Sequence, residues 1–183
     1  MNRDHRLLAA FFLVSALLLS PAISGGQELY TYTVDLLGGI GGSPDVEQGD
    51  GFDNTGLQVN LSMVTEPGTH VGVRVGKLGL DSDEFFGSFE EAELSYLTLA
   101  GEYRFPQTYY ESGIYIGLGG YRLEGTRFGE DDDDTAPGLS LGVTGEFKFN
   151  RWLGLLIELS GHYVDFDEAQ LFGMAHGGLS VHF

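Results

Sequence analysis

The sequence contains no cysteine and few basic residues, and each absence excludes a class of protein. Without cysteine the chain has no disulfide to stabilise it outside the cell, so it depends on burial, on a closed sheet or on a membrane. Lysine and arginine together number 9 against 27 acidic residues, which gives a formal net charge of −18 at pH 7. Because binding to phosphate backbones requires a basic surface, nucleic acid is excluded as a partner.

Long apolar runs are absent after the N-terminal segment. Residues 7–19 are almost entirely apolar, and they lie between a short basic segment and a group of small residues. This pattern predicts a secretory signal peptide over residues 1–24, cleaved after Ser24, with no cysteine there to carry a lipid. No later segment approaches the roughly 20 apolar residues of a membrane-spanning helix. We therefore expect one exported domain over residues 25–183.

What the sequence has in quantity is glycine and aromatic residues, with 29 Gly, 13 Phe and 9 Tyr. This composition favours strands and tight turns over helices. Apolar and polar residues alternate with period two in eight segments, which predicts an all-β fold of eight strands. The segments are Leu29–Leu37, Thr55–Val64, His70–Leu80, Glu91–Phe105, Gly113–Leu123, Gly138–Phe149, Trp152–Val164 and Gln170–Phe183.

Two of these segments depart from simple alternation. The phase of the third shifts near Gly76 and Lys77, which predicts a β-bulge. In the fifth, two assignments stay open, because either Ile114, Ile116 and Leu118 or the tyrosines of the opposite face point outward.

The connections between the predicted strands alternate in length. Every second connection is short, namely 65–69, 106–112 and 150–151. The others are 38–54, 81–90, 124–137 and 165–169; they hold most of the acidic residues, and the first three of them are longer. Short turns at one end and longer loops at the other are typical of outer-membrane barrels. The sequence therefore predicts an eight-stranded antiparallel up-and-down transmembrane β-barrel, with both termini at the short-turn, periplasmic end and the first strand paired with the last.

A soluble exported barrel of lipocalin type is the alternative, because it shows the same alternation with its apolar face turned inward. Three features favour the membrane barrel instead: the alternating turn lengths, the C-terminal Phe183, and aromatic residues where the apolar faces approach the turns. These aromatic residues are Tyr103, Phe105, Phe147, Phe149 and Trp152.

The signal peptide, the glycine-rich stretch Gly113–Tyr121 and the C-terminal stretches Glu158–Phe166 and Gly177–Phe183 resemble a known family. The family is the small outer-membrane β-barrel proteins of Gram-negative bacteria, with opacity-type and OmpA-like barrels as members, and the resemblance covers residues 25–183. It implies outer-membrane localisation and insertion by the outer-membrane assembly machinery, which reads a C-terminal strand ending in Phe. In this chain the implied assembly signal is Leu179, Val181 and Phe183.

Charged residues of both signs fall on the faces predicted to point into the barrel, namely Asp35, Arg74, Glu102, Arg104, Glu146, Lys148, Glu158 and His176. An eight-stranded barrel is filled by its own side chains, and unpaired buried charges are costly. The pattern therefore predicts a structural ion-pair network that plugs the barrel. In the last hairpin we expect Glu158 opposite His176 and His162 opposite Phe172. The alternative is a gated proton or ion path.

The acidic run of the third long connection is a candidate cation-binding loop, made of Glu130, Asp131, Asp132, Asp133 and Asp134. Carboxylates bind hard cations such as Ca²⁺ and Mg²⁺, which at the outer surface also bridge lipopolysaccharide phosphates. The alternative is a solvated charge run without a ligand.

Enzymes that modify lipid A are also built on eight-stranded barrels, so catalysis has to be considered. The deacylase pattern places a serine two residues after a histidine, but Val164 follows His162 and Gly178 follows His176 at that spacing. The common hydrolase, metalloprotease and phosphate-binding motifs are absent. We expect no catalytic residue, no metal centre and no cofactor. The predicted function is that of a monomeric, non-enzymatic barrel with a structural or surface-interaction role, in contact with outer-membrane lipid, lipopolysaccharide and divalent cations. A narrow channel is the alternative.

Overall fold

The computed structural model describes residues 32–43, 54–80, 89–105, 110–127, 130–166 and 169–183. All of them belong to the unit that covers residues 31–183. The predicted signal peptide lies outside the described residues, as do residues 44–53 and 81–88 of the first two long connections. No helix in the described part of the chain is both long and apolar enough to span a bilayer.

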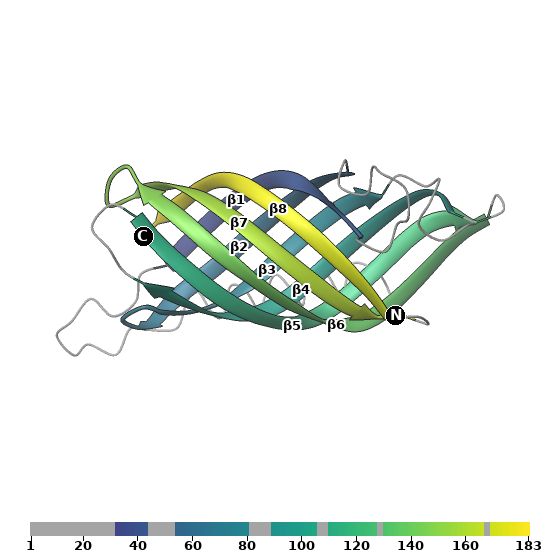
Figure 1. Cartoon of the computed structure of the whole chain (residues 1–183), viewed down its shortest axis with the longest axis horizontal. Coiled ribbons are helices and arrows are strands. Elements are labelled where there is room, and N and C mark those ends of the chain that lie inside the picture. The colour runs from purple at the N-terminus through teal and green to yellow at the C-terminus, as the bar shows by residue number, and fades with distance from the viewer. Residues whose placement is uncertain (1–31, 44–53, 81–88, 106–109, 128–129, 167–168) are drawn as a thin grey trace, which may run out of the picture. The chain divides into compact units, whose positions relative to one another are not determined.

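Eight antiparallel strands form one closed barrel in which each strand pairs with the next and β1 pairs with β8 (Figure 1). The all-β prediction and the up-and-down order are confirmed. The strands are β1 Tyr32–Gly42, β2 Asn54–Glu66, β3 Thr69–Leu80, β4 Phe89–Phe105, β5 Tyr110–Arg127, β6 Glu130–Lys148, β7 Leu153–Asp165 and β8 Ala169–His182. Below, "turn end" means the end with the C-terminus and the connections after β2, β4 and β6, and "loop end" means the other.

The largest difference from the predicted strands lies between β5 and β6. The sequence predicts a loop over residues 124–137, but β5 runs to Arg127 and β6 begins at Glu130, with the two strands paired throughout. This prediction was wrong because acidic side chains disfavour strands only weakly. Their backbone still forms hydrogen bonds when a neighbouring strand lies alongside. β4 follows β5 to this end of the barrel, where Phe89 pairs with Arg127, so β4, β5 and β6 are the three longest strands (Figure 1).

The predicted bulge at Gly76 and Lys77 is also wrong. Both residues pair in continuous register with β2 and with β4. The change of pattern has another cause: Leu78 and Leu80 point into the barrel and are almost fully buried. The apolar residues therefore change from the outer to the inner face at this level while the pleat continues. The irregularity of the β2–β3 pair lies between Val64 and Glu66 instead.

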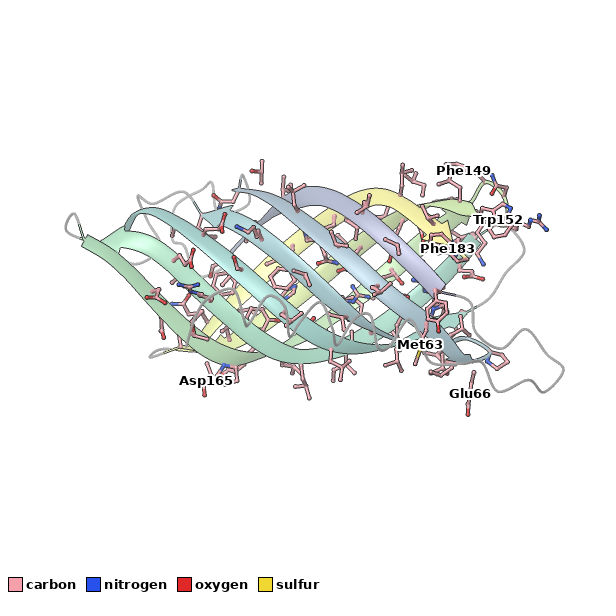
Figure 2. All side chains as sticks on the ribbon, turned by 180° about the vertical axis from the view of Figure 1, so that it is seen from behind. Met63, Glu66, Phe149, Trp152, Asp165 and Phe183 are labelled. Carbon is pink, nitrogen blue, oxygen red and sulfur yellow. The ribbon has the colours of Figure 1, made fainter. Side chains whose placement is uncertain are left out.

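The outer face of the barrel is apolar, as a lipid-facing surface requires. Leu57 is 70 % exposed, and comparable values hold for the outward residues of all eight strands. The open question in β5 is settled, because Ile114, Ile116 and Leu118 are exposed while Tyr115 and Tyr121 are buried. Figure 2 shows side chains directed outward along the strands, with Phe149, Trp152 and Phe183 together at the turn end. All predicted girdle aromatics are exposed there, namely Tyr103, Phe105, Phe147, Phe149 and Trp152.

The interior consists of two layers of different chemistry. Nearer the turn end, most buried side chains are charged or polar, although Leu156 is also buried there, and nearer the loop end most are aliphatic and aromatic, although Asn54 is buried there. We call the first the polar layer and the second the apolar layer. The apolar layer consists of Leu78, Leu80, Ala92, Leu94, Tyr96, Tyr121, Leu123, Ala136, Val164, Phe166, Phe172 and Met174.

Candidate functional site

The polar layer is centred on Glu158 of β7, whose side chain is fully buried. Its carboxylate accepts a short hydrogen bond from the Arg74 guanidinium, reaching across the bore from β3. Gln58 Nε2 donates to Glu158 Oε1 at 3.0 Å and Tyr115 Oη donates to the same oxygen at 2.8 Å. The Arg74 guanidinium also lies 3.4 Å from the centre of the Tyr115 ring. Glu158 is therefore held by side chains from three other strands.

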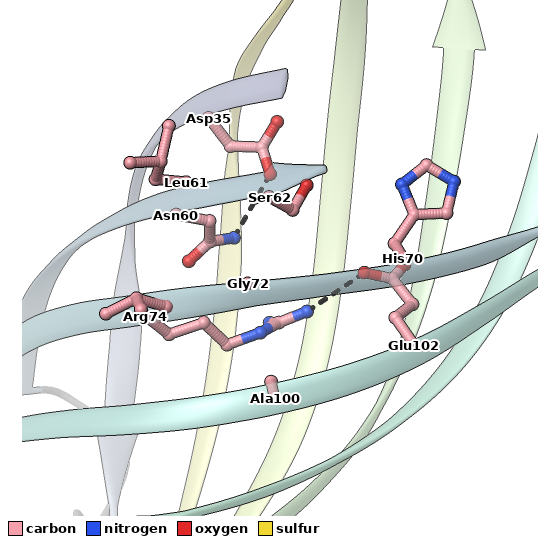
Figure 3. Close-up of a pocket in the computed structure, with 10 residues that line it drawn as sticks. Asp35, Asn60, Leu61, Ser62, His70, Gly72, Arg74, Ala100 and Glu102 are labelled. Atoms are coloured by element: carbon pink, nitrogen blue, oxygen red, sulfur yellow. Dashed lines mark hydrogen bonds and ion pairs between the residues drawn. The ribbon is translucent and has the colours of Figure 1, made fainter. Parts of the chain in front are cut away.

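The two arginines connect the buried carboxylates into one chain of ion pairs. Arg74 pairs with Glu102 (Figure 3) at 3.2 Å, and Arg104 lies 2.9 Å from the other oxygen of Glu102. Arg104 also reaches Glu146 on β6, at 2.8 Å. Each arginine thus contacts two carboxylates, which offsets the cost of burying the charges. These ion pairs extend across the bore of the barrel and fill it.

Neutral side chains complete the hydrogen bonds of the acids, and the sequence interpretation did not include them. Thr144 donates to Glu102 at 2.6 Å. Ser180 donates to Asp35 at 2.6 Å and Asn60 donates to Asp35 at 3.2 Å. Their inward phase was visible in the sequence, but a hydroxyl or amide on a strand also fits a solvent-facing position. Only the register shows which of them meet a carboxylate.

Two predicted members of the network occupy different environments from those expected. His176 does lie opposite Glu158, in the predicted register, and His162 lies opposite Phe172. Among the described residues, however, neither ring nitrogen of His176 has a hydrogen-bond partner, although the side chain is buried. The predicted ion pair between His176 and Glu158 is therefore wrong, because Arg74 and Gln58 already bind the carboxylate oxygens of Glu158.

Lys148 lies at the turn-end mouth of the barrel and not in the buried chain. Its ammonium pairs with Glu111 at 2.5 Å, and its side chain is 31 % exposed. Glu146, two residues earlier, is buried and contacts His182 at 2.5 Å. The predicted network did not include Glu111 or His182: Glu111 lies outside the predicted fifth strand, and His182 has the inward phase of the last strand but no acidic partner in sequence.

A small cavity lies beside the polar layer, between β1, β2, β3 and β4 (Figure 3). Its volume is about 10 Å³, close to the space that one water molecule needs. Asp35, Arg74 and Glu102 line it together with Ser62 and His70. Ser62 Oγ and His70 Nδ1 are buried there, and no described residue forms a hydrogen bond with either atom. The chemistry suits an ordered water, and the volume is far below that of a ligand pocket.

The apolar layer fills the bore on the loop-end side of the polar layer. The Tyr96 and Tyr121 rings stack with their centres 5.7 Å apart, and Tyr121 Oη lies 2.9 Å from His162 Nδ1. Tyr96 donates a short hydrogen bond to Gln58, which links the two layers. Phe172 and Leu94 are fully buried in the same cluster.

Two serines contact a histidine, and one of them, Ser180, lies with its Oγ 3.4 Å from His182 Nε2 and donates to Asp35. Ser160 Oγ lies 3.0 Å from His162 Nε2, but the serine precedes the histidine by two residues. The other ring nitrogen of His162 contacts Tyr121 and not a carboxylate. The pair is directed into the packed interior, so it resembles a structural hydrogen bond more than a nucleophile with its base. Among the described residues, no group of three or more His, Cys, Asp or Glu side chains could hold a metal ion.

The candidate cation-binding run Glu130, Asp131, Asp132, Asp133 and Asp134 lies in β6, paired with residues 123–127 of β5. The prediction that this run forms a loop is therefore wrong. A strand directs successive residues to opposite faces, whereas a cation-binding loop curves them around one centre. Asp133 is exposed and pairs with Arg122 of β5 at 3.1 Å.

The predicted assembly signal lies on the closing strand. Leu179 is 49 % exposed and Phe183 is 62 % exposed on the outer face, with Val181 between them. Phe183 exchanges backbone hydrogen bonds with Tyr32, at 2.8 and 3.2 Å. The C-terminal residue thus completes the contact between the last strand and the first.

The fold is that of known outer-membrane barrels. Over 86 % of this chain and 99 % of the other, the barrel matches Neisserial surface protein A with a TM-score of 0.65 at 13 % identity. It matches a major outer membrane protein from Thermus thermophilus over 84 % and 99 %, with a TM-score of 0.61 at 15 % identity. It matches Ail, the attachment invasion locus protein of Yersinia pestis, over 84 % and 97 %, with a TM-score of 0.55 at 13 % identity. No family model and no curated protein matches the sequence. The shared fold and the apolar outer face support the predicted outer-membrane localisation.

Proposed function

We propose that the protein is a non-enzymatic outer-membrane barrel that acts at its loop end, through interactions at the cell surface. The observation that carries this proposal is the packed interior, where paired charges occupy the polar layer and aliphatic and aromatic side chains occupy the apolar layer. A filled bore favours a role on the outside of the barrel over transport through it.

The proposed orientation follows from the connections. In outer-membrane barrels the short turns face the periplasm and the longer loops face outward. The turn end carries the C-terminus and the aromatic girdle, and the loop end carries the paired ends of the long strands β5 and β6. The proposal includes export by the signal peptide 1–24, insertion by the outer-membrane assembly machinery through Leu179, Val181 and Phe183, and function as a monomer. The partners are outer-membrane lipid, lipopolysaccharide and divalent cations at the acidic loop end.

Cell fractionation and gel migration test the location and the barrel. We expect the mature chain to begin at Gly25, to fractionate with the outer membrane, and to migrate faster on a denaturing gel before heating than after it. A closed barrel resists detergent until it is heated, which gives this difference. A chain recovered as soluble periplasmic protein would contradict the proposal.

Conductance across a planar bilayer separates the surface role from a narrow channel. We expect no discrete conductance from the purified, heat-modifiable protein, because the bore is occupied in both layers. Discrete openings would support the channel instead. In parallel, mass spectrometry of lipid A from cells with and without the protein is expected to give identical acyl chains, and a changed acyl pattern would indicate an enzyme.

A further inference from the structure

The outer wall formed by β3, β4, β5 and β6 has an order of residues that the lipid-facing band alone does not explain. In β3 and β4 the outward position after the exposed Val75 and Leu97, toward the loop end, is a lysine or a serine, and in β5 and β6 an arginine and a threonine lie at the same level. Cross-strand pairing puts these positions in one row, here called the basic row, made of Lys77, Ser95, Arg122 and Thr135.

The neighbouring rows on the same wall are also uniform. One step toward the turn end lies an apolar row, made of Val75, Leu97, Gly120 and Pro137. One step toward the loop end lies an acidic row, made of Gly79, Glu93, Glu124 and Asp133. From membrane to solvent, the wall therefore presents hydrocarbon-like, cationic and anionic surfaces in that order.

The basic row lies on one side of the barrel only. Of the basic side chains that the structure describes, Arg74 and Arg104 are buried in the bore and Lys148 and Arg151 lie at the turn end. Lys77 and Arg122 are thus concentrated on a single wall of a strongly acidic protein.

The spacing of the row suits one phosphate group. Adjacent strands lie about 4.8 Å apart, so the Cα atoms of Lys77 and Arg122 are separated by about 10 Å, with the Ser95 hydroxyl between them. Both side chains are long enough to converge above Ser95. Guanidinium, ammonium and hydroxyl groups are the donors that bind phosphate oxygens.

The ion pairs that these bases make at present are exposed and exchangeable. Lys77 lies 2.5 Å from Glu93 with its side chain 63 % exposed. Arg122 lies 2.7 Å from Glu124 and 3.1 Å from Asp133, with its side chain 44 % exposed. Exposed pairs of this kind contribute little to stability, so a phosphate can replace a carboxylate oxygen at small cost.

We propose that the basic row binds a phosphate of lipid A in the outer leaflet, with the acyl chains lying on the apolar row and the leucines below it. The proposal rests on the orientation given under Proposed function, which directs this wall to the outer leaflet. Charge complementarity and continuity with the lipid-facing band identify the occupant as a phosphorylated lipid. Glu93 and Asp133 hold the bases in place when the lipid is absent.

Native mass spectrometry of the folded barrel in detergent tests the site. The probes are bisphosphorylated lipid A, the same lipid without phosphates, and phosphatidylglycerol, at one fixed magnesium concentration. We expect the native protein to retain bisphosphorylated lipid A at least about tenfold better than either other lipid, since charge-assisted contacts of two bases are lost. The double variant Lys77→Gln/Arg122→Gln is expected to lose that preference.

The matched control is Lys148→Gln/Arg151→Gln, which removes one lysine and one arginine at the opposite end of the barrel. It is expected to keep the preference of the native protein. Equal retention by both double variants, or no preference for phosphate in the native protein, would overturn the site. Equal retention of phosphatidylglycerol would overturn the assignment to lipid A. Heat-modifiable migration of every variant shows that the barrel is intact, so these outcomes leave the proposed surface role to its own tests.

Discussion

The two layers of the barrel interior solve the same problem by different chemistry. A narrow bore has to be filled, and the polar layer fills it with carboxylates and guanidinium groups bonded across the bore, such as Glu158 with Arg74. The apolar layer fills it with aliphatic and aromatic side chains, such as Leu94 and Phe172. The polar layer depends on complete pairing, because any unpaired charge is costly. The apolar layer depends on volume, because any gap loses contacts.

This comparison predicts that the largest single effect comes from breaking the polar layer at its centre. Glu158→Gln keeps the shape of the side chain but leaves Arg74 without its nearest carboxylate. We expect the free energy of unfolding to fall by about 4 kcal/mol. This loss is measured by urea unfolding of the barrel embedded in lipid vesicles, followed through the fluorescence of the single tryptophan, Trp152.

Replacing the pair together sharpens this prediction. The double variant Arg74→Met/Glu158→Leu removes both charges, so we expect a smaller loss than in Glu158→Gln alone. A loss in the double variant that equals the sum of the single losses would show that the two residues act independently, against an ion pair between them.

The next effect in size is a cavity in the apolar layer. Leu94→Ala removes buried methyl groups from a fully buried position, and we expect a loss of about 3 kcal/mol. Because no charge is involved, the loss should be the same at low and high salt. Val75→Ala, on the lipid-facing wall of the adjacent strand, is the control and should cost much less. A strong salt dependence for Leu94→Ala would contradict the division into two layers.

The sequence revealed these layers unequally. Charges on alternating positions indicated the polar layer, since a charged acid such as Glu158 in a membrane strand is far less costly inside the barrel than against lipid. The apolar layer was not identified, because an inward leucine such as Leu78 looks the same as an outward one. For that reason the shift of phase in β3 was interpreted as a bulge. The length of β5 and β6 was missed because Asp131 and its neighbours resemble a loop in composition, whereas strand pairing depends on the partner backbone.

His176 offers a smaller effect of opposite sign. It lies opposite Glu158, and both of its ring nitrogens are buried without a hydrogen-bond partner in the part of the chain that the structure describes. His176→Leu removes the unsatisfied groups, so we expect the free energy of unfolding to rise by about 1 kcal/mol. A Cβ added at Gly39 or Gly56 would lie 2.7 or 3.2 Å from this ring, so keeping both glycines leaves room for the leucine. A loss comparable to that of Glu158→Gln would show that His176 is a working member of the polar layer after all.

The smallest expected effect on stability comes from a residue on the outer wall of the barrel, in contrast to the residues of the bore. Lys77→Gln breaks an ion pair with Glu93 that is mostly exposed, and such pairs contribute about 0–1 kcal/mol. We expect the free energy of unfolding to change by about 0.5 kcal/mol or less, and less still at high salt because exposed charges are screened. Glu93→Gln is the matched change from the other side of the pair. If Lys77→Gln weakens lipid A retention while stability stays at this level, the basic row serves binding and not the fold. A loss of several kcal/mol would instead make Lys77 part of the structure, in the same sense as Arg74.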